Sequence, residues 1–362
     1  MNKKYIAIVA AAVIAIIGFG YACSSYKNYY EIMAVTGATP VAVKQDLNKD
    51  ITLEVSGNTK RIYKFDEKSL NAFASVYLRT LEMTSEGKFE GTYRYSGIPV
   101  LNILEGIAPE KPEGAPFNRP LDMVVTFISS SGKQSHFSYG ELTMTDDSYP
   151  VILAYSRNEL APSENPQKKP YTLNIHKGDV KGLRLVCPGD KDTARYLDDV
   201  TKIVLREIDV DNSGLPEMRK GFKCSSDSLK GVYKNKISTL VLKGTEPVAV
   251  TNWLRTGHGQ GYKGLASTAN GFSLRSVLRK NFPGAGEKHF FLFVACDGYR
   301  SIFSGKEIFS TDAGKDMMIM TKIDGKPVMG KISVAPVRDY FVDRGVWGLT
   351  HIVMLDAIDD IK

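Results

Sequence analysis

The chain contains an internal repeat, and no other feature limits the folds open to it as strongly. Several blocks occur twice in the same order. With the first copy given before the second, they are 78–80 and 254–256, 96–104 and 270–278, 124–142 and 290–308, 184–188 and 331–336, and 200–205 and 349–355. Each copy is long enough to bury a hydrophobic core of its own. The repeat therefore predicts a duplicated domain and not a solenoid of short units.

Within each copy, the residue pattern predicts short helices and paired strands. Gly97 and Gly271 each come before apolar residues at helical spacing, which predicts a glycine turn that enters a short helix. The dipeptides Ser131-Gly132 and Asp297-Gly298 stand between alternating apolar segments, as hairpin turns do. We therefore expect an α+β fold in which mixed sheets are combined with short helices.

Composition places the limits of the two predicted domains. Residues 211–236 are rich in Gly, Ser, Asp and Lys and show no sustained periodicity, which is typical of a linker. The first domain is then expected at 49–210 and the second at 237–362. Before them we expect a signal or anchor segment at 1–23 and a polar, Tyr-rich spacer at 24–48.

The first residues have the layout of an export signal. Lys3 and Lys4 come before an uncharged apolar run at 5–22, which is also close to the minimum length for a membrane span. Cys23 follows Ala22 where a bacterial lipoprotein carries its lipidated residue, although Gly20 replaces the usual Leu. Cleavage, lipidation at Cys23 and retention as an anchor all stay open. In each case the two lysines place the rest of the chain outside the cytoplasm, so we expect an extracytoplasmic, cell-envelope protein that is membrane-anchored or periplasmic.

Charge and spacing exclude several classes of function. The net charge of +7 is spread along the chain, without the basic stripe and interleaved aromatics that a nucleic-acid binder shows. The four cysteines form no CxxC pair and the five histidines no HExxH motif, which argues against zinc and c-type haem sites. An exported chain can form disulfides, but the cysteine spacing does not fix their pairing. The modest positive charge favours anionic ligands or lipids weakly.

The order of several short motifs resembles a known family. The motifs are Tyr95-Ser96-Gly97-Ile98-Pro99-Val100, Ser131-Gly132, Leu185-Val186-Cys187-Pro188-Gly189-Asp190-Lys191, Arg195-Tyr196 and Val200-Thr201-Lys202-Ile203. Together they resemble the oxidoreductase molybdopterin-binding domain of sulfite oxidases, over about 50–210 and more loosely over 238–356. The resemblance implies two tandem domains of this type. It also implies a molybdopterin cofactor, oxygen-atom transfer at molybdenum and electron transfer to a redox protein partner.

The chain departs from this family at the metal ligand. Active members hold molybdenum through a Cys in the loop before the glycine turn, and the corresponding segments 80–87 and 256–264 contain none. Sulfur-bound metals prefer a soft thiolate, and Met83 in the first segment is a weaker donor that we interpret as a packing residue. Cys187 and Cys296 lie in apolar, strand-like runs and are interpreted as buried small residues. We therefore predict no metal ligand in either copy.

Four residues are candidates for binding a cofactor or another anion. Lys191 and Arg195 lie in a loop that resembles the family loop in contact with the pterin phosphate, and their charges suit an anion. His258 and Lys263 lie in the segment 257–264, GHGQGYKG, whose glycines allow backbone amides to cradle an anion. The alternative for both segments is a solvated surface loop.

Three functions remain open at this stage. In the first, the protein is a molybdopterin-dependent oxidoreductase, and a pocket should gather Lys191, Arg195 and a sulfur donor. In the second, it is a non-catalytic ligand- or protein-binding module that has lost the metal site, and a cleft with a few polar groups should lack a thiolate. In the third, it is a scaffold with a large apolar patch. The expected partners are a small anionic ligand or a redox protein, and the membrane through the N-terminal segment.

Overall fold

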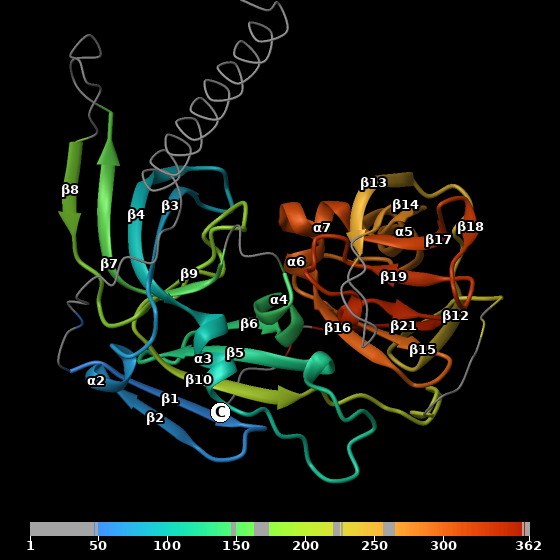
Figure 1. The fold of residues 1–362 in the computed structure, drawn as a ribbon, viewed down its shortest axis with the longest axis horizontal. Coiled ribbons are helices and arrows are strands. Elements are labelled where there is room, and N and C mark those ends of the chain that lie inside the picture. The colour runs from blue at the N-terminus through green and yellow to red at the C-terminus, as the bar shows by residue number, and fades with distance from the viewer. Residues whose placement is uncertain are drawn as a thin grey trace, which may run out of the picture.

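The fold is built mainly from β-strands. The computed structural model describes residues 50–145, 150–162, 174–219, 227–255 and 265–356, together with Leu47, Ser225 and Ile358. Strands make up 46% of the structure and helices 15%, and the strands form four sheets. The sheets lie at the corners of a propeller-like ring (Figure 1). The expected α+β fold of two tandem sulfite-oxidase-type domains is therefore wrong.

The shortness of the helices explains this error. Among the described residues the longest helix is α5 (Leu274–Asn281), with 8 residues. Helices of this length cannot cover a sheet as a separate layer, so the sheets bury most of the core between themselves. The sequence pattern locates the helices but does not reveal that the strands on either side dominate the architecture.

Two of the sheets belong to the N-terminal half, residues 50–210. The first has the order β2 (Tyr63–Asp66), β1 (Thr52–Gly57), β10 (Val200–Glu207), β5 (Met123–Ser129) and β6 (Gln134–Ser138). The second has the order β3 (Val76–Met83), β4 (Phe89–Pro99), β7 (Ile152–Ala161) and β8 (Asn174–Gly178), and β9 (Arg184–Val186) also pairs with β7. The helices of this half are α2 (Glu67–Leu70), α3 (Val100–Gly106) and α4 (Tyr139–Thr143), with a 3-10 turn at Pro120–Asp122.

The other two sheets belong to the C-terminal half, residues 227–356. One has the order β12 (Lys236–Thr239), β11 (Lys230–Tyr233), β21 (Leu349–Leu355), β15 (Phe290–Ala295) and β16 (Arg300–Ser304). The other has the order β13 (Pro247–Arg255), β14 (Leu265–Ser273), β17 (Met318–Ile323), β19 (Ser333–Ala335) and β20 (Val346–Trp347), with β18 (Lys326–Pro327) beside β17. Besides α5, this half contains α6 (Gly305–Ser310), α7 (Asp312–Asp316) and a 3-10 turn at Val342–Arg344.

The two halves share a strand order. In β2-β1-β10-β5-β6 and in β12-β11-β21-β15-β16, the strands correspond position by position. In both sheets the pair formed by the early and the last strand, β1 with β10 and β11 with β21, is parallel, and the remaining pairs are antiparallel. The hairpins predicted at Ser131-Gly132 and Asp297-Gly298 are β5–β6 and β15–β16. Each hairpin leads directly into a short helix, α4 or α6.

The repeated glycines lie within strands and not in turns. Gly97 is in β4 and Gly271 is in β14, and each marks a register shift against the neighbouring strand. A Cβ at Gly97 would lie 2.7 Å from the carbonyl oxygen of Leu153, and one at Gly271 would lie 2.1 Å from that of Ile319. The glycines thus permit a close approach of two backbones at a β-bulge, and the predicted turn at these positions is wrong.

Several sequence predictions fall outside the described residues or at their limits. The signal or anchor segment, the spacer, Cys23, His258 and Lys263 all lie outside the part of the chain that the structure describes. β11 and the first residue of β12 fall inside the segment 211–236 that was expected as a linker. Within the described ranges, no helix combines the length and the apolar character that a membrane crossing requires.

Candidate functional site

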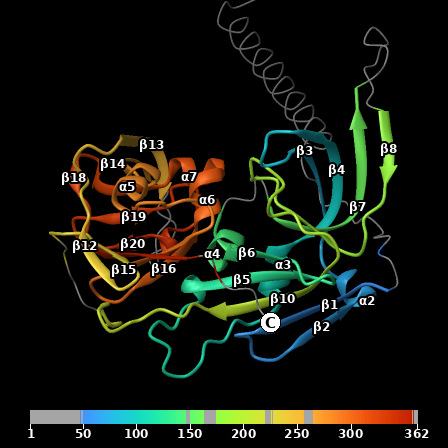
Figure 2. The same cartoon turned by 180° about the vertical axis from the view of Figure 1, so that it is seen from behind.

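A pocket of about 410 Å³ lies between the two halves. Its walls come from β3, α4 and the loop 187–195 of the N-terminal half, and from α6, α7 and the loop after β19 of the C-terminal half. Both views of the fold place α4 and β6 beside α6 and β16 at this boundary (Figures 1 and 2). The pocket therefore depends on the packing of one half against the other.

A buried arginine, Arg195, organises the N-terminal side of the pocket. Its guanidinium makes a two-point contact with Asp190, with Nε 2.8 Å from Oδ2 and Nη2 2.5 Å from Oδ1. The third nitrogen, Nη1, lies 2.7 Å from Oε1 of Glu141. The guanidinium also stacks over the ring of Phe137, at 4.1 Å from the ring centre. Arg195 is thus held on all sides by its own half of the chain.

Arg344 repeats this arrangement in the C-terminal half. Nε and Nη2 each lie 2.8 Å from a carboxylate oxygen of Asp339, and Nη1 lies 2.6 Å from Oε1 of Glu307. The guanidinium stacks over Phe303 at 4.6 Å. In both halves the Asp precedes its Arg by five residues in the sequence. The two halves therefore contribute equivalent Asp–Arg–Glu triads to one boundary.

Two serines join the triads across that boundary. Ser138 caps the N-terminus of α4 and Ser304 caps that of α6, each by accepting a hydrogen bond from the backbone amide three residues later. The Ser304 hydroxyl also donates to Oε2 of Glu141 at 2.9 Å, and the Ser138 hydroxyl donates to Oε2 of Glu307 at 3.3 Å. Each glutamate is thus bound by an arginine of its own half and by a serine of the other half.

The contacts around the triads are not equivalent in the two halves. Gly140 follows Tyr139 in α4, and a Cβ there would lie 2.1 Å from Cδ of Arg344, so only glycine leaves room for that side chain. The corresponding position in α6 is Lys306. Its Nζ lies 2.8 Å from Oδ2 of Asp192 in the other half and 2.9 Å from Oε2 of Glu287 in its own.

Burial changes the acid–base behaviour of the triads. Removal of Glu141 from water raises the pKa of its carboxyl to about 7, although the neighbouring Arg195 opposes this change. Burial likewise raises the pKa of Glu307, against the opposing effect of Arg344. The pKa of Arg195 is held well above its usual value, because Asp190 and Glu141 outweigh the effect of its burial. Both arginines therefore stay charged, while Glu141 titrates near neutral pH.

Positive side chains surround the mouth of the pocket. Arg79 and Lys191 are exposed, and within the described part of the chain neither forms an ion pair. Arg338 is also exposed, and its Nε lies 2.6 Å from Oδ2 of Asp316 on α7. Asp312 is the exposed acidic residue of the lining. Since Glu141, Asp190 and Glu307 are already paired, the accessible charge at the mouth is positive.

The structure brings two of the predicted site residues together. Lys191 and Arg195 line the same pocket, but they differ in availability. Lys191 points its charge at solvent without a partner among the described residues, whereas Arg195 is committed to Asp190 and Glu141. A role for either residue in binding a cofactor stays a prediction.

Sequence reasoning missed the other members of the triads, Glu141, Glu307, Asp339 and Arg344. The signal was present, because Phe-Ser is followed by Glu three residues after the Ser in both copies, at 137–141 and 303–307. The Asp–Arg spacing of five residues also recurs. Two such coincidences within an internal repeat could have identified these residues as a connected set.

The side chains of this pocket do not fit a molybdenum–pterin centre. Cys187 is the sulfur donor in the lining, and it is 1% exposed. Burial raises the pKa of its thiol well above the usual value, so the thiolate that a metal needs is disfavoured. The carboxylates of Glu141, Asp190 and Glu307 are held by arginines. Among the described residues, no three His, Cys, Asp or Glu side chains are grouped as a metal would require. Met83 is half-buried in β3, as a packing residue would be.

The other described cysteine has a different environment. Cys296 is half-buried and disulfide-bonded, and not a buried free thiol as its sequence context had indicated. Cys187 is a free, buried cysteine, as predicted.

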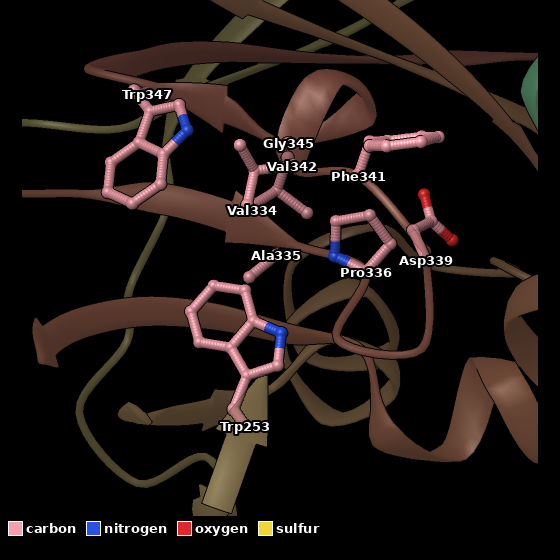
Figure 3. A pocket seen from close by; sticks show the side chains of 9 residues that line it. All are labelled: Trp253, Val334, Ala335, Pro336, Asp339, Phe341, Val342, Gly345 and Trp347. Carbon is pink, nitrogen blue, oxygen red and sulfur yellow. The ribbon is translucent and has the colours of Figure 1, made fainter. Parts of the chain in front are cut away.

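A second, apolar pocket adjoins the first. It has a volume of about 530 Å³ and is lined by Val250, Trp253, Val337, Tyr340 and Phe341, together with Arg338 and Asp316. Figure 3 shows a small neighbouring cavity that shares Trp253, Asp339 and Phe341 with this pocket and is also lined by Trp347. Tyr340 and Phe341 are 48% and 54% exposed, so aromatic surface is open to solvent here.

Comparison with known proteins adds little information about the function of this site. No family model matches the chain, and no curated protein matches it. Among solved structures, the chain is distantly similar to the sulfane dehydrogenase SoxCD from Paracoccus pantotrophus. The two share 11% sequence identity at a TM-score of 0.31, over 89% of this chain and 86% of that chain. A similarity at this level supports no conclusion about mechanism.

Proposed function

We propose that the protein is a non-catalytic binding module of the cell envelope, whose pocket between the two halves takes a small organic anion. One observation carries this proposal. Arg79 and Lys191, which have no ion-pair partner among the described residues, lie at the mouth of a pocket whose buried acidic side chains are already paired with arginines. An entering carboxylate, sulfonate or phosphate therefore meets cations without displacing a protein carboxylate.

The chemistry of the lining supports binding over catalysis. Among the described residues of the lining, the Cys187 thiol is neutral and enclosed, and the carboxylates of Glu141, Asp190 and Glu307 are each engaged in an ion pair with an arginine. A pocket of about 410 Å³ lies within the usual size of small-molecule sites. A binding role accounts for these properties without a cofactor.

Two features support a location outside the cytoplasm. The basic residues and the apolar run at 1–22 have the layout of an export signal. The disulfide at Cys296 is of a kind that persists in oxidising compartments.

The test is a titration of the full-length protein with methanesulfonate at low salt, in which isothermal titration calorimetry measures the binding. We expect weak, saturable binding that Lys191→Gln weakens by about tenfold, since a charge-assisted hydrogen bond is lost. Lys60→Gln removes an exposed charge in the N-terminal half far from the lining and should leave the affinity unchanged. Binding that is insensitive to Lys191 would contradict the assignment of the anion to this pocket.

The oxidoreductase alternative has its own test. Full-length protein is produced in a host that synthesises molybdopterin and is then analysed for molybdenum. We expect less than about one tenth of an equivalent, because the lining offers no thiolate. Near-stoichiometric molybdenum that is lost in Cys187→Ser would refute the non-catalytic proposal.

A further inference from the structure

The two pockets at the boundary share a wall. Arg338 lines both of them, and α7 separates them, with Asp312 facing the first and Asp316 facing the second. The Arg338–Asp316 ion pair therefore stands at the junction. The cavities are adjoining chambers and not independent sites on opposite faces.

The chambers differ sharply in chemistry. The first is rimmed by Arg79, Lys191 and Arg338. The surface of the second is mostly apolar, although its lining also includes the polar residues Thr251, Asn252, Asp316, Arg338 and Asp339. Trp253 is 6% exposed and forms the base of the apolar chamber, while the exposed rings of Tyr340 and Phe341 stand at its opening. Contiguous exposed apolar surface is one mark of a ligand-binding groove.

We propose that the two chambers bind one ligand, an organic anion that carries an aromatic ring. This inference rests on the proposed function and specifies its ligand. The anionic group lies between Arg79 and Lys191, and the ring enters the apolar chamber against Trp253 and Phe341. Cations at one end and aromatic faces at the other match the two ends of such a molecule, because rings pack well against aromatic side chains and sulfonates or carboxylates bind guanidinium groups in two-point fashion.

The position of the tryptophans makes the inference testable by fluorescence. The chain contains two Trp residues: Trp253 lines the apolar chamber, and Trp347 lines a small neighbouring cavity that also contains Trp253 and Phe341 (Figure 3). Trp emission thus comes from this chamber and from the cavity beside it. An iodinated ring is a contact quencher, so 4-iodobenzenesulfonate serves as the probe. Methanesulfonate lacks the ring, and 4-iodobenzyl alcohol lacks the charge.

The experiment titrates the full-length protein with each compound. We expect 4-iodobenzenesulfonate to quench Trp emission saturably, with an affinity about tenfold or more above that of methanesulfonate by calorimetry, since burial of a ring adds to the binding of the charge. Lys191→Gln should weaken both sulfonates, whereas Phe341→Ala should weaken the aryl sulfonate alone. Phe89→Ala is the matched control, because Phe89 and Phe341 are exposed to 59% and 54%.

Each outcome decides between the proposals. If both sulfonates bind but the ring adds no affinity, or if Phe341→Ala has no effect on the aryl sulfonate, the shared-ligand inference is wrong and the anion site stands. If neither sulfonate binds, both proposals fail. If the uncharged alcohol quenches as tightly as the aryl sulfonate, the apolar chamber acts without the charged one and the inference is again wrong. Circular dichroism confirms that each exposed-residue variant is folded.

Discussion

The Ser304 hydroxyl in the C-terminal half donates a hydrogen bond to Glu141 in the N-terminal half, at 2.9 Å. The reverse contact, from Ser138 to Glu307, is 3.3 Å long. Both carboxyls are buried and therefore need these donors in addition to their arginines. The boundary between the halves is accordingly held together by polar groups that neither half satisfies alone, and its stability should depend on the charge state of Glu141.

The first prediction concerns pH. The folded-state pKa of Glu141 is about 7, above its ordinary value of 4.5. Folding therefore favours the protonated form, and this contribution to stability is complete below about pH 4.5 and is lost as the pH rises through 7. Burial also raises the pKa of Glu307, and it raises the pKa of Asp122 to about 6, so both groups act in the same direction. We expect the free energy of unfolding in urea to fall by up to about 1.4 kcal/mol per pH unit from Glu141 alone.

Glu141→Gln tests whether Glu141 causes this pH dependence of the free energy of unfolding. In this variant the free energy of unfolding should decrease less steeply between pH 5 and 8, because one of the titrating groups is gone. Arg195 keeps its two-point contact with Asp190. Glu113→Gln, at an exposed position, is the control and should keep the wild-type slope. An unchanged slope in Glu141→Gln would show that the pH dependence arises elsewhere.

The second prediction concerns the arginine of the C-terminal triad. Arg344 is fully buried, and its removal leaves Asp339 and Glu307 without their cation. Arg344→Met should therefore destabilise the fold by about 3–5 kcal/mol, measured as urea unfolding. The triple variant Arg344→Met, Asp339→Asn, Glu307→Gln should recover part of the loss. Arg61→Met, at an exposed site, should change stability by less than about 0.5 kcal/mol. A triple variant less stable than Arg344→Met would contradict this account.

The third prediction concerns the glycines of the β-bulges. Gly271→Ala places a Cβ 2.1 Å from the Ile319 carbonyl oxygen, and backbone must move to accept it. We expect a loss of about 1–3 kcal/mol, measured by thermal unfolding. Gly286→Ala is the control, since the nearest atom would lie 3.8 Å from the new Cβ. Equal stability of the two variants would rule out close backbone approach as the reason for the repeated glycine.

The fourth prediction concerns Cys187. Its thiol is 1% exposed and its pKa is raised by burial, so alkylation with iodoacetamide at pH 8 should be at least about 100-fold slower in the native protein than in urea. Mass spectrometry of the Cys187 peptide measures both rates. Rapid native alkylation would indicate an accessible thiolate and would reopen the question of a metal ligand.

Local features of the fold were more predictable than its architecture. The hairpin turns at Ser131-Gly132 and Asp297-Gly298 could be predicted because a turn and its flanking alternation are encoded within a few residues. The β-bulge at Gly97 could not, since the reason for glycine is the Leu153 backbone of another strand. The fold class was wrong because residue spacing locates short helices but does not show how little of the core they cover.

In the candidate site, too, local features could be predicted from the sequence and contacts between distant segments could not. Lys191 and Arg195 were found from the sequence because charged residues in a loop after a strand are visible as such. The partners of Arg195 were not found, since Glu141 comes from a distant helix and meets the arginine only after the sheets have packed. The apolar chamber was missed entirely. Its exposed rings, Tyr340 and Phe341, lie in a short loop without periodicity, so no pattern marks them in the sequence.

The difference between Gly140 and Lys306 governs which surfaces can associate. Arg344 lies where a side chain at position 140 would stand. If two C-terminal halves from different molecules met in the same way, Lys306 of one would occupy the place of Arg344 of the other, and two cations would collide without room or counter-charge. The N-terminal half accepts Arg344 and supplies Asp192 to Lys306. The chain thereby favours pairing of an N-terminal half with a C-terminal half over pairing of two C-terminal halves from neighbouring molecules.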